Sequence, residues 1–208
     1  MGDFDTRQTL LIKIRDRADQ RAWEEFVDLY TPLVIRYSAS RGVPDSDRAD
    51  VVQEIFKAIA RAMERFDYDR DRAKFRTWLF TVCRSKINNY HRSKQRRPQP
   101  AAFEDPDHSI EDQVDPREEK DWEGDYRRHM FQWAVGIVRP EFSPNQWAAF
   151  WETALNERKA EELTEELGMS KGAIYVAKSR VIARLRERVA SVAGDSDIGI
   201  DPDPAHHD

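Results

Sequence analysis

The residues best suited to contacting a polyanion lie near the end of the chain, between Lys171 and Arg188. Hydrogen-bond donors recur there at helical spacing, which suits contacts with phosphates and with base edges. These donors are Lys171, Tyr175, Lys178, Ser179, Arg180 and Arg184. The segment therefore predicts a DNA-contacting helix, and the alternative is a basic amphipathic helix in an ordinary helical bundle.

The sequence around these donors predicts the two helices of a helix-turn-helix. Ser170 is a suitable N-cap, because its hydroxyl can accept a bond from an amide in the first helical turn. Apolar residues then follow at the spacing of one buried stripe: Ile174, Ala177, Val181 and Leu185. A shorter helix containing Leu163 and Leu167 precedes the turn, and Gly168 stands where a left-handed residue ends a helix. This arrangement would place the second helix in a major groove.

Charge is unevenly distributed along the chain. The net charge is −5. Residues 101–125 contribute about −9 and residues 194–208 about −5, which leaves about +9 on the rest of the chain. Attraction to nucleic acid depends on local charge, so this distribution is compatible with DNA binding.

The composition also argues against several classes of protein. The single cysteine, Cys83, excludes an intrachain disulfide framework and a cysteine-based zinc cluster, and it fits a cytoplasmic location. No long apolar run predicts a membrane span or a signal peptide. No phosphate-binding loop, dinucleotide fingerprint or nucleophile elbow is present. We therefore expect neither an enzyme nor a cofactor or metal site.

Helical periodicity predicts an all-α protein with two small helical domains joined by a flexible acidic linker. The first domain is expected over residues 1–97, the linker over 98–121 and the second domain over 122–192, followed by a disordered acidic tail over 193–208. Within the second domain, Ser143, Pro144 and Gln146 predict a helix start with a capping box.

Two helices of the first domain carry polar faces. One, beginning near Asp47, presents Asp50, Gln53, Glu54 and Lys57 opposite its apolar stripe. The other, beginning near Phe75, is expected to expose Arg76, Arg84, Ser85, Asn88, Asn89 and Arg92. Phe66 and Tyr68 precede it and offer ring faces for stacking. From the residues alone, a solvated face is the ordinary interpretation of the first set, and core packing that of the two rings.

Three motifs, in this order, resemble the extracytoplasmic-function type of bacterial RNA polymerase sigma factor, in the sigma-70 superfamily. Residues 50–56 resemble its polymerase-binding segment, residues 75–79 its promoter-melting segment, and residues 161–174 its helix-turn-helix. The resemblance covers roughly residues 6–97 and 122–190. In one departure from the family pattern, Glu157 and Arg158 stand where Gly-Leu is frequent.

The resemblance implies a function and partners. The ridge around Gln53 and Glu54 would bind core RNA polymerase, whose largest-subunit coiled coil and flap are the expected contacts. The third helix, with Phe66 and Tyr68, would melt the −10 promoter element and capture an unpaired base, and the helix after Ser170 would read the −35 element. The sequence leaves open whether an anti-sigma protein also binds.

Two other functions stay open on the sequence. One is a helix-turn-helix regulator that does not join the polymerase, with the N-terminal half as a sensor or dimerisation module. The other is a cryptic enzyme acting on nucleic acid. Complex formation with core polymerase separates the first from a sigma factor, and DNA cleavage or modification without polymerase would favour the second.

Overall fold

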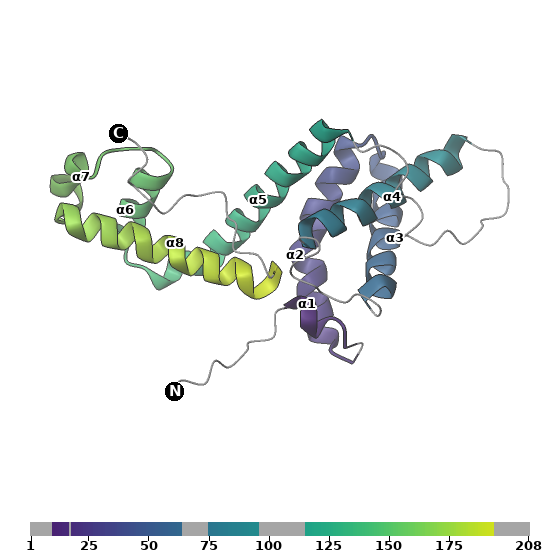
Figure 1. The fold of residues 1–208 in the computed structure, drawn as a ribbon, viewed down its shortest axis with the longest axis horizontal. Coiled ribbons are helices and arrows are strands. Elements are labelled where there is room, and N and C mark those ends of the chain that lie inside the picture. Colours follow the sequence, from purple (N-terminus) through teal and green to yellow (C-terminus); the bar gives the residue numbers. More distant parts are fainter. Residues whose placement is uncertain (1–9, 17, 64–74, 96–114, 194–208) are drawn as a thin grey trace. The chain divides into compact units, whose positions relative to one another are not determined.

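The computed structural model describes residues 10–16, 18–63, 75–95 and 115–193, and every regular element in these ranges is helical (Figure 1). This confirms the expected all-α class. The chain divides into two compact units, residues 1–126 and 127–208. Phe66, Tyr68, the expected linker up to residue 114 and the tail from residue 194 lie outside the described residues.

Unit 1 contains α1 (Leu10–Lys13), α2 (Gln20–Ser40), α3 (Asp45–Met63), α4 (Phe75–Gln95) and the beginning of α5 (Pro116–Val138). The carboxylate of Asp19 caps α2 by accepting a bond of 3.0 Å from the backbone of Ala22. The helix then continues through Pro32, whose side chain is exposed. Shortly after α2 ends, Gly42 has a φ of 78°, which glycine adopts without strain. The chain can thus turn tightly between α2 and α3.

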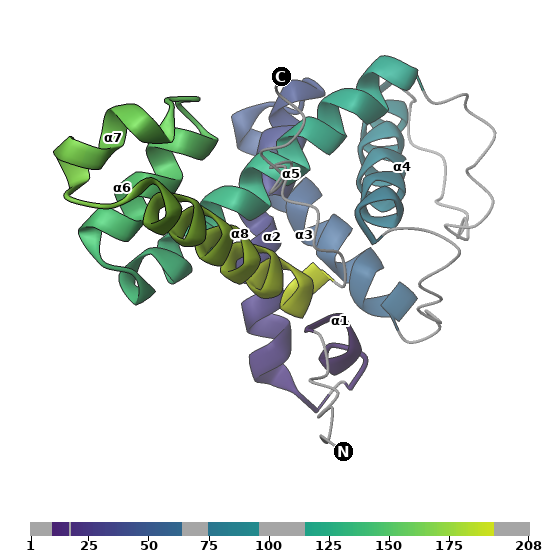
Figure 2. The same ribbon diagram turned by 60° about the vertical axis from the view of Figure 1, so that its left-hand side comes forward.

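Aromatic packing joins the three long helices of unit 1, and α3 contacts both α2 and α4 (Figure 2). The ring of Phe26, on α2, lies edge-on to Phe56 of α3 at 6.2 Å between centroids and to Phe75 of α4 at 6.1 Å. Phe26, Phe56 and Phe75 are all buried. Edge-to-face pairs of this kind add to the burial of apolar area, so the core fixes which faces of α3 and α4 point outward.

The beginning of α5 corrects the domain boundary expected at residue 122. The helix starts at Pro116, six residues before the expected end of the linker, and Asp115 accepts a bond of 2.8 Å from the backbone of Arg117. Trp122 and Tyr126 are buried in unit 1, where Tyr126 stacks on Tyr30. Their apolar area needs a partner, and α2 and α4 supply it. The expectation of a flexible chain over 116–121 is therefore wrong.

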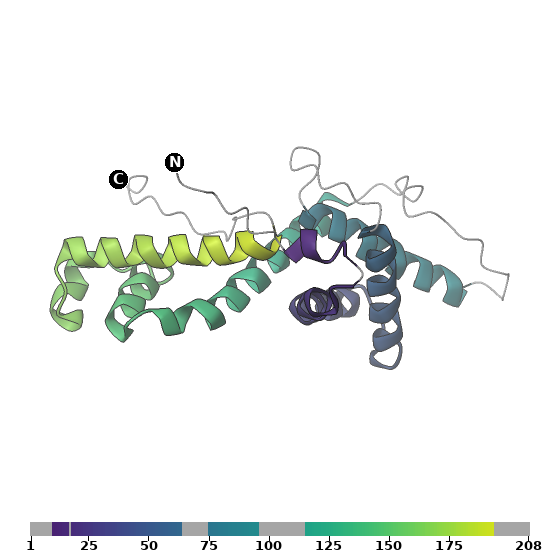
Figure 3. The ribbon, with the colours of Figure 1, turned by 90° about the horizontal axis from the view of Figure 1, so that it is seen from below.

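Unit 2 contains the end of α5, the short 3-10 helix η2 (Arg139–Glu141), α6 (Pro144–Ala154), α7 (Ala160–Leu167) and α8 (Lys171–Ala193). Both α6 and α7 contact α8, toward its N-terminal end (Figure 3). The predicted capping box is confirmed: the hydroxyl of Ser143 accepts from the backbone of Gln146, and the Gln146 side chain accepts from the backbone of Ser143. The core cluster of the three helices consists of Ala149, Ala160, Leu163, Leu167, Ile174 and Ala177.

Candidate nucleic-acid and partner-binding surfaces

The polar ridge of α3 is exposed, as the sequence predicts. Asp50, Gln53, Glu54 and Lys57 all have exposed side chains, while Ile55 and Ile59 on the opposite side are fully buried. The ammonium group of Lys57 lies 2.9 Å from Glu54 and 3.4 Å from the amide oxygen of Gln53. This contact with Lys57 lowers the pKa of Glu54. The ridge is thus a fixed, fully ionised surface at neutral pH.

The N-terminal half of α4 differs from the expectation of an exposed basic face. Arg76 is buried, with 8% of its surface exposed, because the beginning of α5 covers it. Its guanidinium is paired with Glu123. One carboxylate oxygen of Glu118 lies 3.5 Å from the Nε atom of Arg84, which is also largely covered. The predicted exposure of Arg76 is therefore wrong, because two glutamates that the sequence placed in or beside a linker lie on this face.

The C-terminal half of α4 is more open and is held in place at its end. Ser85, Asn88 and Asn89 are half-buried, and Arg92 is exposed. Asp47, near the start of α3, accepts a bond of 2.6 Å from the hydroxyl of Tyr90 and lies 2.8 Å from Lys94. These bonds, that of Lys94 first, hold the pKa of Asp47 well below its usual range. The anchor fixes the rotation of α4 and so the direction of its polar face.

The turn between α7 and α8 has the geometry that the sequence predicts. Gly168 has a φ of 61°, in the left-handed region, and ends α7. The hydroxyl of Ser170 accepts a bond of 3.3 Å from the backbone of Ala173 and so caps α8. From α6, the side-chain amide of Asn145 donates a bond of 2.9 Å to the carbonyl of Leu167. The last turn of α7 is therefore tied to both neighbouring helices.

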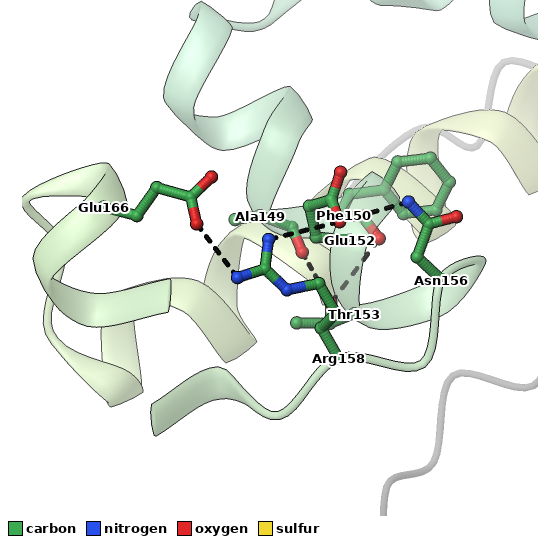
Figure 4. A network of polar contacts seen from close by, with 7 residues as sticks. All are labelled: Ala149, Phe150, Glu152, Thr153, Asn156, Arg158 and Glu166. Atoms are coloured by element: carbon green, nitrogen blue, oxygen red, sulfur yellow. Dashed lines mark hydrogen bonds and ion pairs between the residues drawn. The ribbon is translucent and has the colours of Figure 1, made fainter. Parts of the chain in front are cut away.

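A second network holds the loop between α6 and α7 (Figure 4). The guanidinium of Arg158 lies 2.9 Å from Glu166 of α7 and 3.5 Å from Glu152 of α6. Asn156 also donates to Glu152, at 3.1 Å. The preceding residue, Glu157, has a φ of 54°, where glycine would be unstrained. Arg158 thus links the two helices across a strained turn and sets the position of α7.

Two of the candidate cations on α8 are engaged with carboxylates. Lys171 forms an ion pair with Glu161 of α7 and lies 5.9 Å from the ring centre of Tyr175. Arg184 binds Glu141 of η2 through two nitrogens. These contacts orient α8 against its neighbours. Arg184 therefore has a structural role in unit 2 that the sequence did not predict.

The remaining candidates form a surface on the outer side of α8. Ser179 and Arg180 are exposed, and Tyr175 and Lys178 are half-buried. Val176, which the sequence analysis missed, is 50% exposed beside them. The available signal was its position outside the apolar stripe. Hydroxyl and guanidinium groups can bond base edges, and an exposed valine can contact a thymine methyl group. This surface has the chemistry of base-edge recognition.

Two other classes of site were tested against the structure. Within the part of the chain that the structure describes, the His, Cys, Asp and Glu side chains form no group that could hold a metal ion. None of the described helices is both long and apolar enough to cross a membrane. The surfaces that remain, on α3, α4 and α8, are those of an all-helical protein suited to binding macromolecules.

Comparison with known proteins places this chain in a family. Residues 26–97 match the family described as Sigma-70 region 2. The chain is 35% identical over 81 residues to the RNA polymerase sigma factor NccH of Alcaligenes xylosoxydans xylosoxydans, which is 39% of this chain and 42% of that protein. It is 36% identical over 98 residues to the ECF RNA polymerase sigma-E factor of Escherichia coli (strain K12), which is 47% of this chain and 49% of that protein. The chain belongs to the sigma-70 family.

The match does not extend over the whole of these relatives: the chain spans about half the length of the curated proteins it matches. A solved structure, that of CnrH in complex with the cytosolic domain of CnrY, aligns with 86% of this chain and 94% of that one. Its sequence identity is 22% and its TM-score 0.35. A TM-score this low carries no argument about the chain.

Proposed function

We propose that this protein is a sigma factor that binds core RNA polymerase and directs it to promoters by sequence-specific recognition and melting of DNA. The observation that carries the proposal is the Sigma-70 region 2 match over residues 26–97, because this stretch contains the α3 ridge and the whole of α4 as described. The protein acts by binding, and the polymerase supplies the catalytic chemistry.

The α3 ridge is the proposed polymerase contact. Its exposed carboxylates and amide lie on one side of a helix whose opposite side is locked in the core. Such a face suits a basic helical surface, and the largest-subunit coiled coil is the partner we propose. Gln53 and Glu54 are the first contacts, because complementary charge steers association and fixes register. Contact of the second unit with the polymerase flap belongs to the same proposal.

The polar face of α4 is the proposed −10 surface. Ser85, Asn88 and Asn89 can bond the edges of unpaired bases, and Arg92 can hold a phosphate. The anchor at Asp47 keeps these groups on the outward side of the helix. The roles proposed for Phe66 and Tyr68 in receiving an extruded base rest on the sequence, since both lie outside the described residues.

The outer surface of α8 is the proposed −35 reader. Tyr175, Lys178, Ser179 and Arg180 lie in the first half of a helix whose start is capped and whose position is fixed by α6 and α7. In a helix-turn-helix, this half of the second helix lies in the major groove. Lys171 would exchange its exposed ion pair with Glu161 for a DNA phosphate, because pairs at exposed positions cost little to break.

The test is a reconstitution with purified core RNA polymerase. We expect a 1:1 complex on gel filtration and selective run-off transcription from a randomised promoter library. Core polymerase alone serves as the control. If no complex forms, or if initiation is no more selective than with core enzyme alone, the proposal is wrong. DNA cleavage or modification by the protein without polymerase would contradict the non-enzymatic part of the proposal.

A further inference from the structure

A carboxylate is held in a pocket of unit 1 that is built of three donors. Glu118, on α5, has only 8% of its side chain exposed. The hydroxyl of Tyr37 donates to one of its oxygens, and the guanidinium of Arg41 lies 3.4 Å from the same oxygen. The Nε atom of Arg84 lies 3.5 Å from the other oxygen. One anion is thus surrounded by two cations and a hydroxyl.

The pocket has the composition of a phosphate site. Arginine guanidinium groups bind carboxylates and phosphates with the same planar geometry. Burial, and then the bond to Glu118, raise the pKa of Tyr37 well above its usual range, so its hydroxyl is a donor at neutral pH. Arg41 keeps 40% of its side chain exposed, which leaves an approach to the pocket from solvent.

The segment that carries Glu118 also covers the other candidate DNA contact on this side of α4. We call residues 116–126 the strap. Its Trp122 packs edge-on to Tyr37, at 5.0 Å between centroids, and the indole nitrogen donates a bond of 3.0 Å to the carbonyl of Arg76. Beside it, Glu123 pairs with the guanidinium of Arg76. Strap and DNA backbone would therefore compete for the same two α4 arginines.

We propose that Tyr37, Arg41 and Arg84 form a binding site for a DNA backbone phosphate, and that Glu118 of the strap fills this site in the free protein. Tyr37 and Arg41 lie at the end of α2, outside every surface assigned above. The inference rests on the proposed function, because it takes α4 to be a DNA-binding helix. DNA must displace the strap, so the free protein binds DNA weakly. The apparent affinity falls by the fraction of molecules in which the pocket is open.

The test measures binding of the full chain to a fluorescein-labelled single-stranded DNA of mixed sequence, by anisotropy, over a series of salt concentrations. Glu118→Gln is expected to lower Kd about tenfold, because the neutral amide no longer competes with phosphate. It should also steepen the salt dependence by about 0.7 in the slope of log K against log salt, the value for one added phosphate on a single strand. Glu119→Gln is the matched control, an exposed neighbour on the same helix, and should change Kd less than twofold.

A second substitution identifies the pocket itself. In the Glu118→Gln background, Arg41→Gln should remove the added slope, whereas a residue that only supports the fold would leave the slope unchanged. If Glu118→Gln and Glu119→Gln have equal effects, or if Arg41→Gln leaves the slope as it is, the inference is overturned. These results do not depend on polymerase: selective run-off transcription without the expected slopes sinks the pocket alone, and the expected slopes without run-off sink the sigma proposal alone.

Hydrogen exchange on the unmodified protein gives an independent measurement if Glu118→Gln does not fold. Backbone amides of residues 116–126 should exchange faster when the single-stranded DNA is saturating, because the strap has left unit 1. The amides of α3 provide the internal control and should not exchange faster. Unchanged or slower exchange of the strap with DNA bound would overturn the inference.

Discussion

The guanidinium of Arg184 grips the carboxylate of Glu141 through two bonds, 2.6 Å from Nε and 3.0 Å from a terminal nitrogen. A third bond of 2.8 Å joins it to Glu187 on its own helix. The bond to Glu141 is the first cause of the raised pKa of Arg184. By sequence this arginine belongs with the DNA-contacting donors of α8. By structure it ties α8 to η2, and this difference leads to the first prediction.

Arg184→Ala and Arg180→Ala should have separable effects. Arg180 is exposed in the DNA-facing half of α8, and its loss should weaken binding to the −35 element by about 1–3 kcal/mol if it reads a base. Arg184→Ala should lower the melting temperature of the protein and change DNA affinity by less than about twofold, since its donors are already engaged. Thermal unfolding and binding of a −35 duplex check both. A large affinity loss in Arg184→Ala with an unchanged melting temperature would contradict this assignment.

Glu54→Arg should weaken binding to core polymerase without unfolding the protein. The substitution reverses the charge at the centre of the α3 ridge and places a second cation beside Lys57, while the buried side of α3 is untouched. We expect at least a tenfold loss of affinity in a pull-down titration and a matching loss of run-off transcription. Glu24→Arg, a charge reversal at an exposed position of α2, is the control. Equal behaviour of the two variants would remove the ridge from the polymerase interface.

Asp47→Asn should remove part of the pH dependence of stability. The pKa of Asp47 is depressed in the folded state by Lys94 and Tyr90, so its contribution is present above the unfolded pKa, near 4, and is lost as the pH falls through the lower folded value. The wild type should therefore melt at a higher temperature than Asp47→Asn at pH 7. The gap should narrow steadily below about pH 4. A gap that is constant from pH 7 to pH 2 would show that the ionised carboxylate is not the cause.

Glu157→Gly should stabilise unit 2. A non-glycine residue at a φ of 54° carries a steric cost that glycine avoids, and this exceeds the entropy that glycine adds to the unfolded chain. The net gain should be about 0.5–1 kcal/mol in the free energy of unfolding. Denaturant unfolding measures it, with Glu165→Gly in the exposed interior of α7 as a control that should destabilise. A loss of stability in Glu157→Gly would mean that its side chain makes a contact stronger than the strain.

The sequence predicted the candidate sites of unit 2 better than those of unit 1. Gly168, Ser170 and the stripe from Ile174 act within a few residues of one another, so spacing alone reveals them. Arg76 shows the limit of this reasoning, because its burial depends on a glutamate 47 positions away. The start of α5 did carry a local signal, since Asp115 and Pro116 are a good cap and first residue. The acidic and proline-rich composition of the preceding residues concealed it.

The sequence by itself determined the helical class, the caps, the buried stripes and the motifs that place the chain in the sigma-70 family. These properties depend on the periodicity of the backbone and on short-range hydrogen bonds. Only the tertiary structure decided which charges meet: Arg84 with Glu118, Arg76 with Glu123 and Arg184 with Glu141. A charge pair joins residues by distance in space, and the order of residues along the chain does not contain that distance until the core has fixed the helices.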